Sequence, residues 1–445
     1  MKRVFFLLGL LGLAVSLSAH PWKPRHYVII DTDGGIDDQK AICMLLASPD
    51  VRVLAITASG GFLEAKDAEK KIRLMLDEFR HEGLPLASGD EAVDLIIKTL
   101  SEETTPVTFI ELASLETVAK TMEKSDLFSG KIRQILWSNG GLPGEDDFNY
   151  RTAPEAARKV LSGPIPVSVA GSGGTGFYDP YFMSALAKIN TRYAKKVTSI
   201  INDASSHAFA FSAFDEMIPL LLHYPSLFKP TTSDQKNSYF LPGDITFLHD
   251  ATIRILSGQT VQKMQAIKSF PSDTSFYMKD LQPFVTEIQN KYGEDEWTSG
   301  VIASELHRHL GVFAIIGVKM GIRAREYFCT GVDEMSVLSY AGSTPPLSCM
   351  NDGLQVSTGA TPGHGLLDVK RQEPFAASAE FTYRGRTIRI TLKKEIAAKM
   401  LSELKDINFV YGLDSDIYWE MVRKNTIKYW LLFDRNEIFD IEPIK

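Results

Sequence analysis

The chain has 445 residues, in which 48 basic side chains stand against 55 acidic ones, for a formal net charge of −7. At about 150 residues per domain, this length predicts two or three compact units with sizeable cores. The chain lacks the surplus of positive charge that draws proteins to nucleic-acid backbones or anionic lipid. Composition therefore argues against both partners and favours a small neutral or weakly charged ligand.

Residues 1–19 have the order of a secretory signal peptide. Lys2 and Arg3 precede the apolar run Val4–Val15, and small residues follow up to Ala19. An uncleaved anchor is the weaker alternative, because about 12 apolar residues are too few for a bilayer-spanning helix of about 20. We expect cleavage near Ala19 and an exported protein, periplasmic or extracellular, without a stable membrane anchor.

Short apolar runs alternate with stretches of helical periodicity in residues 25–270. The first runs are Tyr27–Ile30 and Val53–Thr57, and others follow at intervals up to about residue 170. Strands that alternate with helices predict an α/β domain with a doubly wound, mostly parallel sheet, whose ligands bind at the carboxyl ends of the strands. We interpret the less regular segment 229–280 as the end of this domain and a linker.

Four carboxylates follow the first predicted strand directly: Asp31, Asp33, Asp37 and Asp38. Carboxylates this close repel one another unless a cation lies among them. Ca²⁺ suits such a site, since it takes six to eight oxygen ligands and tolerates irregular geometry. A solvated turn that caps the next helix is the simpler alternative, but capping requires only one carboxylate.

The same Asp-x-Asp-Gly motif also resembles the start of the haloacid-dehalogenase-type phosphatases. There Asp31 would be a phosphoryl nucleophile beside Mg²⁺, and Asp146-Asp147 would be the further acidic pair. This alternative leaves the Asp37-Asp38 pair without a role.

A different pattern begins near residue 285 and continues to residue 445. Ile302–Tyr327 predicts a long helical stretch, Met335–Tyr340 a strand, and Glu380–Ile390 a hairpin. This mixture predicts a second domain of the α+β class.

The run from Ile30 to Asp38 closely resembles the opening motif of the inosine-uridine-preferring nucleoside hydrolases, with Gly34 where that family usually has Pro. Three later segments resemble the family in the same order, so that the resemblance covers about residues 25–250. They are Ala113–Thr117, Asn139–Gly141 with Asp147–Ala157, and Phe214–Phe228. The resemblance implies hydrolysis of N-glycosidic bonds in ribonucleosides or related ribosides.

The resemblance also implies residue roles. The implied Ca²⁺ ligands are Asp33, Asp38, the main-chain carbonyl of Glu116, and Asp215. Asp33 would also be the general base for a metal-bound water. The residues implied to orient the ribose are Asp37, Asp147 and Asn149. Asp250 is a rival to Asp215, because His249-Asp250 keeps the His-Asp pair of the family.

Two departures from the family weaken the catalytic interpretation. Gly61 stands where the family has an Asn that contacts ribose, and Phe214 replaces a His that often protonates the leaving base. His207 is a candidate replacement for that acid. A protein that binds a riboside without hydrolysing it therefore stays an alternative.

The C-terminal half resembles the FmdE family, which takes its name from formylmethanofuran dehydrogenase. The resemblance rests on His307–Phe313 and Cys349–Gly359, and it implies a site for a transition metal such as Zn²⁺. The candidate ligands are His307, His309 and Cys349, with His364 as a further one. Gly311 stands where that family has a Cys, so a decayed site with a buried thiol is the alternative.

These inferences combine into one expectation, an exported Ca²⁺-dependent N-ribosyl hydrolase with a second metal-binding domain. We expect a homo-oligomer whose partner is a small riboside. The sequence leaves open whether the second domain covers the first site and supplies the acid that Phe214 replaces.

Overall fold

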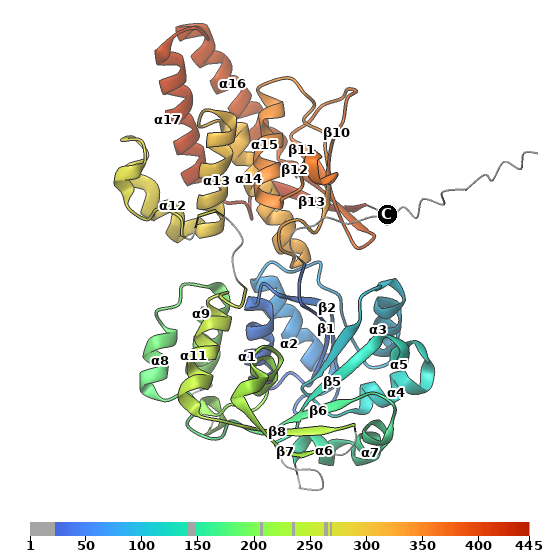
Figure 1. The fold of residues 1–445 in the computed structure, drawn as a ribbon. Coiled ribbons are helices and arrows are strands. Elements are labelled where there is room, and N and C mark those ends of the chain that lie inside the picture. The colour runs from blue at the N-terminus through green and yellow to red at the C-terminus, as the bar shows by residue number, and fades with distance from the viewer. Residues whose placement is uncertain are drawn as a thin grey trace, which may run out of the picture.

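Eight strands form the sheet of the N-terminal domain, in the order β3-β2-β1-β4-β5-β6-β8-β7 (Figure 1). The computed structural model describes residues 23–444 except 141–146, 205–207, 234–235, 262–265 and 268, so the predicted signal peptide, Asp146 and His207 lie outside the described residues. The strands are β1 His26–Thr32, β2 Val51–Ala58, β3 Leu86–Ser88, β4 Val107–Glu111, β5 Ile132–Ser138, β6 Val167–Ala170, β7 Phe228–Ser233 and β8 Ser238–Pro242. Neighbouring strands are parallel except β7 and β8, which confirms a mostly parallel sheet.

Helices cover both faces of this sheet. Because side chains alternate along a strand, Val28 and Ile30 of β1 enter one core and Ile29 enters the other. Helices on the first face are α1 Ile36–Ala47, α2 Ala65–Glu78, α8 Pro180–Leu186, α9 Arg192–Asp203, α10 Met217–His223 and α11 Ile245–Leu256. Helices that contribute to the second core are α3 Asp90–Glu102, α4 Glu116–Lys124, α5 Leu127–Lys131 and α7 Pro154–Ser162, and the short α6 Phe148–Thr152 precedes α7. The doubly wound fold is therefore confirmed.

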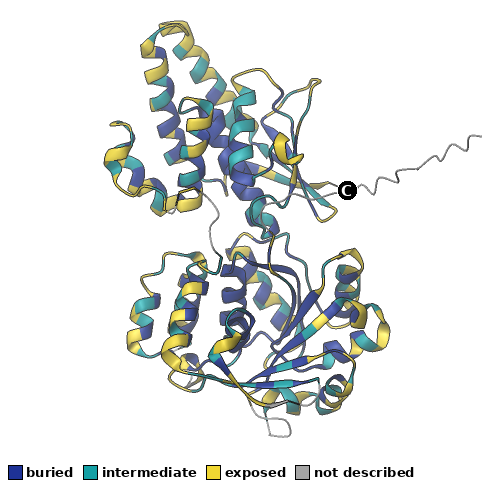
Figure 2. Cartoon of the chain, viewed as in Figure 1, coloured by how far each residue is buried: buried dark blue, intermediate teal, exposed yellow. Residues whose placement is uncertain are grey.

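The C-terminal domain combines a five-stranded sheet, in the order β10-β9-β11-β12-β13, with long helices. Its strands are β9 Ser336–Ser339, β10 Leu367–Val369, β11 Ser378–Tyr383, β12 Arg386–Leu392 and β13 Phe439–Ile444. Its helices are α12 Val285–Tyr292, α13 Glu294–His307, α14 Val312–Phe328, α15 Met350–Thr358, α16 Lys394–Tyr411 and α17 Asp416–Leu432. The predicted hairpin is β11 and β12, and the second domain is of mixed class as expected. Figure 2 shows its buried residues on the strands and on the helix sides that face them.

The long helical sequence predicted over Ile302–Tyr327 is divided between two helices. Helix α13 ends at His307, Arg308 takes the left-handed conformation with φ 67°, and α14 begins at Val312. The carbonyl of Leu310 in the break accepts a hydrogen bond of 3.0 Å from Thr426 Oγ1 on α17. Tertiary contacts therefore override a local sequence that favours a continuous helix.

Helices α14 and α15 pack with their backbones in direct contact. A Cβ added at Gly353 would lie 2.0 Å from the carbonyl oxygen of Ala314, and one added at Gly317 would lie 2.1 Å from that of Met350. Real carbon atoms do not approach oxygen this closely, so both positions require glycine. The close packing of α14 and α15 therefore depends on these two glycines.

We predict that Gly353→Ala destabilises this domain by about 1–3 kcal/mol, because the methyl group forces the two helices apart. The control is Gly130→Ala in α5, where an added Cβ meets open space and the change costs nothing or stabilises slightly. Thermal unfolding followed by circular dichroism measures both variants. Equal midpoints for Gly353→Ala and wild type would contradict the packing argument.

The second domain docks against the edge of the large sheet where β1 and β2 begin (Figure 1). Arg52 at the start of β2 pairs with Glu334, with 2.8 Å between Nε and Oε2, and Gly83 N–H donates to the carbonyl of Tyr327 at 2.9 Å. Glu326 of α14 forms ion pairs with Arg192 of the first domain and with Arg435 of the second. Ion pairs and a main-chain hydrogen bond thus fix the relative position of the two domains.

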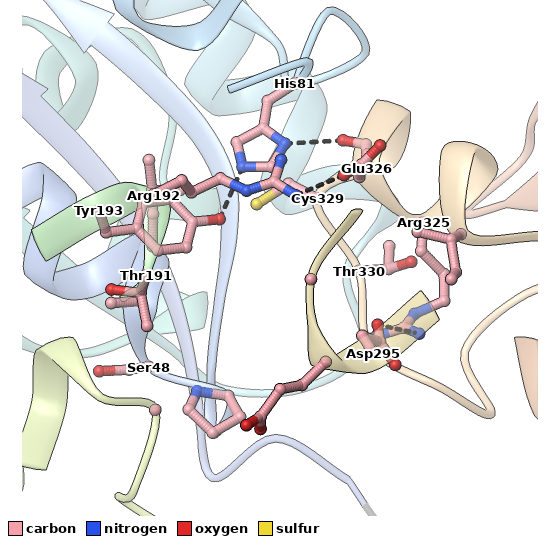
Figure 3. Close-up of a pocket in the computed structure, with 18 of the residues that line it drawn as sticks. Ser48, His81, Thr191, Arg192, Tyr193, Asp295, Arg325, Glu326, Cys329 and Thr330 are labelled. Atoms are coloured by element: carbon pink, nitrogen blue, oxygen red, sulfur yellow. Dashed lines mark hydrogen bonds and ion pairs between the residues drawn. The ribbon is translucent and has the colours of Figure 1, made fainter. Parts of the chain in front are cut away.

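A cavity of about 860 Å³ lies between the domains (Figure 3). His81 lines it and bridges the domains, since Nδ1 donates to the carbonyl of Glu326 at 2.7 Å and Nε2 accepts from Tyr193 Oη at 2.8 Å. Burial lowers the pKa of His81 to about 4, so its ring is neutral near pH 7.

Among the described residues, no helix has the length and apolar character needed to cross a bilayer.

Candidate metal centre

The acidic motif lies where β1 ends and α1 begins, at the carboxyl edge of the sheet. Asp31 lies near the end of the strand, and Asp37 and Asp38 occupy the first turn of α1, where free backbone N–H groups favour negative charge. Gly34 makes the turn with φ 76°. Pro, whose φ is fixed near about −65°, cannot adopt this conformation, so this turn is specific to glycine.

Three carboxylates from two distant segments converge at this edge. Ligand oxygens of Asp37, Asp38 and Asp215 all lie within 4.8 Å of one another. Asp215 precedes α10 and is 2 % exposed, whereas its rival Asp250 is an exposed residue of α11. The structure thus brings Asp215 to the motif and leaves Asp250 away from it.

The electrostatics of this cluster require a positive charge. Burial and mutual repulsion raise the pKa of Asp38 and of Asp215 well above the ordinary value, and burial raises that of Asp37 to about 6. The neighbouring Lys40 does not serve, because its Nζ lies 2.6 Å from Glu216 Oε1 and donates to the carbonyl of Ser212 at 2.7 Å. Charge balance therefore requires protons or a bound cation.

The carboxylates also lie close to the backbone of Gly35. A Cβ added at Gly35 would lie 2.7 Å from Asp38 Oδ2, 2.8 Å from Asp37 Oδ1 and 3.4 Å from Asp33 Oδ1. Asp215 Oδ2 is buried and accepts no hydrogen bond from the described residues. An all-oxygen donor set with an unused buried oxygen fits a hard cation such as Ca²⁺.

Asp33 lies beside this group rather than within it. Its Oδ2 accepts from Phe62 N–H at 2.9 Å and its Oδ1 from Gly35 N–H at 3.3 Å. A Cβ at Gly61 would lie only 2.3 Å from Asp33 Oδ2, so no side chain fits there. In this structure Asp33 thus lies against the backbone of Gly61, in space that a side chain at position 61 would need.

Asp147 and Asn149 lie together at the same edge, at the start of α6. Asp147 accepts from the N–H of Gly140 at 2.8 Å and from that of Asn149 at 3.0 Å. The side-chain amide of Asn149 donates to the carbonyls of Leu112 and Ser138, at 3.1 Å and 3.0 Å. Because both of its N–H groups are used, Asn149 offers a ligand only its carbonyl oxygen, which accepts from hydroxyl groups.

Glu116 is the first residue of α4. Its side chain is half exposed and pairs with Lys120 at 2.9 Å. A role for its main-chain carbonyl in metal binding stays a prediction.

A second buried acid, Glu111 at the end of β4, was not predicted from the sequence. It lies beside Asp31, which is fully buried and accepts from Thr57 Oγ1 at 2.5 Å. Burial raises the pKa of Asp31 to about 6, and burial and Asp31 raise that of Glu111 well above its usual range. The sequence feature that could have identified Glu111 is its place as an acidic residue at the end of β4, the strand next to β1. Full burial of Asp31 also disfavours its proposed role as a phosphoryl nucleophile.

In the C-terminal domain, His307 and His309 face each other with ring centroids 4.2 Å apart. A Cβ at Gly311 would lie 3.1 Å and 3.3 Å from their Nε2 atoms, so both rings point at the position where the related family has Cys. Asp352 lies 2.7 Å from His307 Nδ1, as a carboxylate that orients a metal-bound histidine does. Cys349 has its pKa raised to about 11, by burial and then by Asp352. His364 is bonded elsewhere, to Gly359 and Asp333.

Comparison with known proteins finds two families in this chain. Residues 28–91 match the model of the inosine-uridine preferring nucleoside hydrolases. Residues 306–412 match FmdE, the molybdenum formylmethanofuran dehydrogenase operon family. Both resemblances expected from the sequence are confirmed.

Among similar proteins are the pyrimidine-specific ribonucleoside hydrolases RihA of Salmonella paratyphi A and Salmonella agona, each 28% identical. Each match covers 32% of this chain and 59% of the relative, so the chain spans less than two thirds of their length. Similar solved structures include the plant nucleoside hydrolase PpNRh1, with 17% identity, a TM-score of 0.45, and coverage of 53% of this chain and 99% of that one. The inosine-uridine preferring nucleoside hydrolase of Bacillus anthracis is 16% identical, with a TM-score of 0.43. The match covers 53% of this chain and 100% of that one.

We predict that Gly35→Ala weakens Ca²⁺ binding at least about tenfold, or by about 1.4 kcal/mol. The added methyl group occupies the space among the oxygens of Asp37 and Asp38. Gly60→Ala is the matched control, since a Cβ there meets no atom within 4 Å. Isothermal titration of the EDTA-treated protein with Ca²⁺ provides the comparison, and equal affinities for the two variants would place the ion elsewhere.

Proposed function

We propose that this protein is a Ca²⁺-dependent hydrolase of N-glycosidic bonds in ribonucleosides or related ribosides. The observation that carries the proposal is the convergence of Asp215 on Asp37 and Asp38, two acids of the segment that matches the nucleoside hydrolase model. A bound Ca²⁺ supplies a water of lowered pKa and positive charge for ribose hydroxyls. Asp37 joins this ligand group in addition to its predicted contact with the sugar.

Side chains of the protein act as the general base and bind the ribose. Asp33 is the general base, because its hydrogen bonds to Phe62 and Gly35 fix its carboxylate and burial raises its pKa above the usual value. Asp147 and Asn149 present acceptors to the ribose hydroxyls. Phe214 is partly buried beside Asp215 and provides no proton for the leaving base, which favours bases that leave without side-chain protonation.

We predict release of free base and ribose from a mixture of ribonucleosides in the presence of Ca²⁺. Asp38→Asn removes one negative charge from the ion site and lowers the rate at least about a hundredfold. High-performance chromatography measures the base and a reducing-sugar assay measures the ribose. Asp250→Asn on the exposed face of α11 is the matched control and keeps the wild-type rate.

Three other outcomes would each select a different function. Nucleoside binding without turnover would make the protein a non-catalytic riboside-binding or metal-sensing module, as the Phe214 substitution favours. Phosphate release that depends on Asp31 would favour the phosphatase alternative. Equal turnover by Asp38→Asn and wild type would remove the acidic cluster from the mechanism.

We also propose that the protein is exported and that its first 19 residues are removed. Expression of the full chain in a Gram-negative host should place the protein in the periplasmic fraction. N-terminal sequencing should then begin at His20. Retention of Met1 in a membrane fraction would show instead that the apolar run is an uncleaved anchor.

We propose that His307 and His309 bind a transition metal such as Zn²⁺. Among the described residues Cys349 does not form a group with them whose ligand atoms all lie within 4.8 Å, so its part in the site rests on the family resemblance alone. The support is the convergence of the two imidazoles on Gly311, with Asp352 behind His307. The missing Cys leaves a position that water can occupy.

A further inference from the structure

A second group of metal-binding residues lies at the opposite edge of the large sheet. Ligand atoms of His26, Asp50 and His223 all lie within 4.8 Å of one another. His26 begins β1, Asp50 precedes β2, and His223 ends α10. The backbone holds the first two together, since the N–H groups of Arg25 and His26 donate to the carbonyl of Asp50 at 2.9 Å and 3.0 Å.

Hydrogen bonding determines which nitrogen of His223 carries the proton. Ser48 Oγ donates to the carbonyl of Met44 at 3.1 Å, so it acts only as an acceptor toward His223 Nε2, 2.9 Å away. The proton of the neutral ring is therefore on Nε2, and Nδ1 has a free lone pair. Burial lowers the pKa of His223, which keeps the ring neutral at pH 7.

This arrangement places two electron-pair donors opposite each other. His223 Nδ1 lies 3.6 Å from Asp50 Oδ2, beyond hydrogen-bond distance. Two ligands on a tetrahedral zinc, at about 2.0–2.2 Å from the ion, are about 3.4 Å apart. Asp50 Oδ1 accepts from Thr260 Oγ1, which orients the other carboxylate oxygen. The separation fits a shared metal ion better than direct contact.

His26 completes the group from the side of solvent. Its ring lies perpendicular to that of His223, with centroids 5.6 Å apart. Burial, and next the neighbouring His223, lower its pKa to about 4, so this ring is neutral as well. Nη2 of Arg133 donates to its Nδ1 across a long contact of 3.4 Å, so a metal on Nε2 requires the ring proton to move to Nδ1 and this contact to open.

We propose that His26, Asp50 and His223 form a binding site for a borderline divalent cation such as Zn²⁺. Two imidazoles and one carboxylate are the ligand set that zinc accepts with water as a fourth ligand. Ser48 orients His223 and also lines the cavity between the domains, so the site adjoins that cavity. The ion would tie the start of β1 to α10 and stabilise the edge on which the second domain docks.

The test uses the full chain with His307→Ala and His309→Ala, so that the C-terminal candidate site is removed. After EDTA treatment, an excess of Ca²⁺ fills the acidic cluster, and Zn²⁺ is then titrated by calorimetry. We expect one Zn²⁺ per chain, with affinity at least about tenfold weaker in Asp50→Asn and in His223→Gln. The matched control His249→Gln, whose ring stacks on Phe182 away from the site, keeps the affinity.

A measurement on the unsubstituted chain covers the case in which a variant fails to fold. Crystals soaked in Zn²⁺ should give an anomalous difference peak among His26, Asp50 and His223. No peak there, no Zn²⁺ uptake by the His307→Ala/His309→Ala chain, or equal affinities for Asp50→Asn and its control would each overturn the proposal.

Discussion

Repulsion among buried carboxylates governs the N-terminal domain. Asp33, Asp38 and Asp215 are at most 3 % exposed, and Asp37 adds a fourth negative charge. The nearest buried cation is already neutralised, since Lys40 pairs with the fully buried Glu216. Unpaired buried charges cost several kcal/mol each, so the domain forms this cluster at the expense of stability unless a cation binds. Binding of a cation to this cluster would therefore stabilise the fold, as in other sites without a preformed counter-charge.

The cluster could be predicted because its main part is local in sequence. Four acids within eight residues after an apolar strand are visible without any structure. The alternation of strands and helices predicted which edge they occupy, and the β11–β12 hairpin followed from its own pattern. Asp215 needed the family resemblance, since no local feature separates it from Asp250.

Other features depend on contacts between distant residues and could not be predicted. Arg308 interrupts a helical sequence because a residue on α17 binds the carbonyl of Leu310. Gly353 and Gly317 are informative only once α14 and α15 are seen to touch. The individual elements β7, β8 and α11 of the segment interpreted as the end of the domain and a linker were not predicted, since strands at a sheet margin have short, irregular patterns. His26 and His223 are single histidines with no motif around them.

The place where the second domain packs bears on whether it supplies the acid that Phe214 replaces. Arg52 and Gly83 anchor the second domain where β1 and β2 begin, whereas the acidic cluster lies where β1 ends. Among the described residues, the contacts of the second domain therefore lie at the edge of the sheet opposite the acidic cluster. In a doubly wound sheet, ligands bind at the edge formed by the carboxyl ends of the strands. A second domain can therefore pack against the opposite edge without blocking the path of a ligand to the site. The fusion thus holds the acidic cluster and the two histidines of the second domain at separate places on one chain.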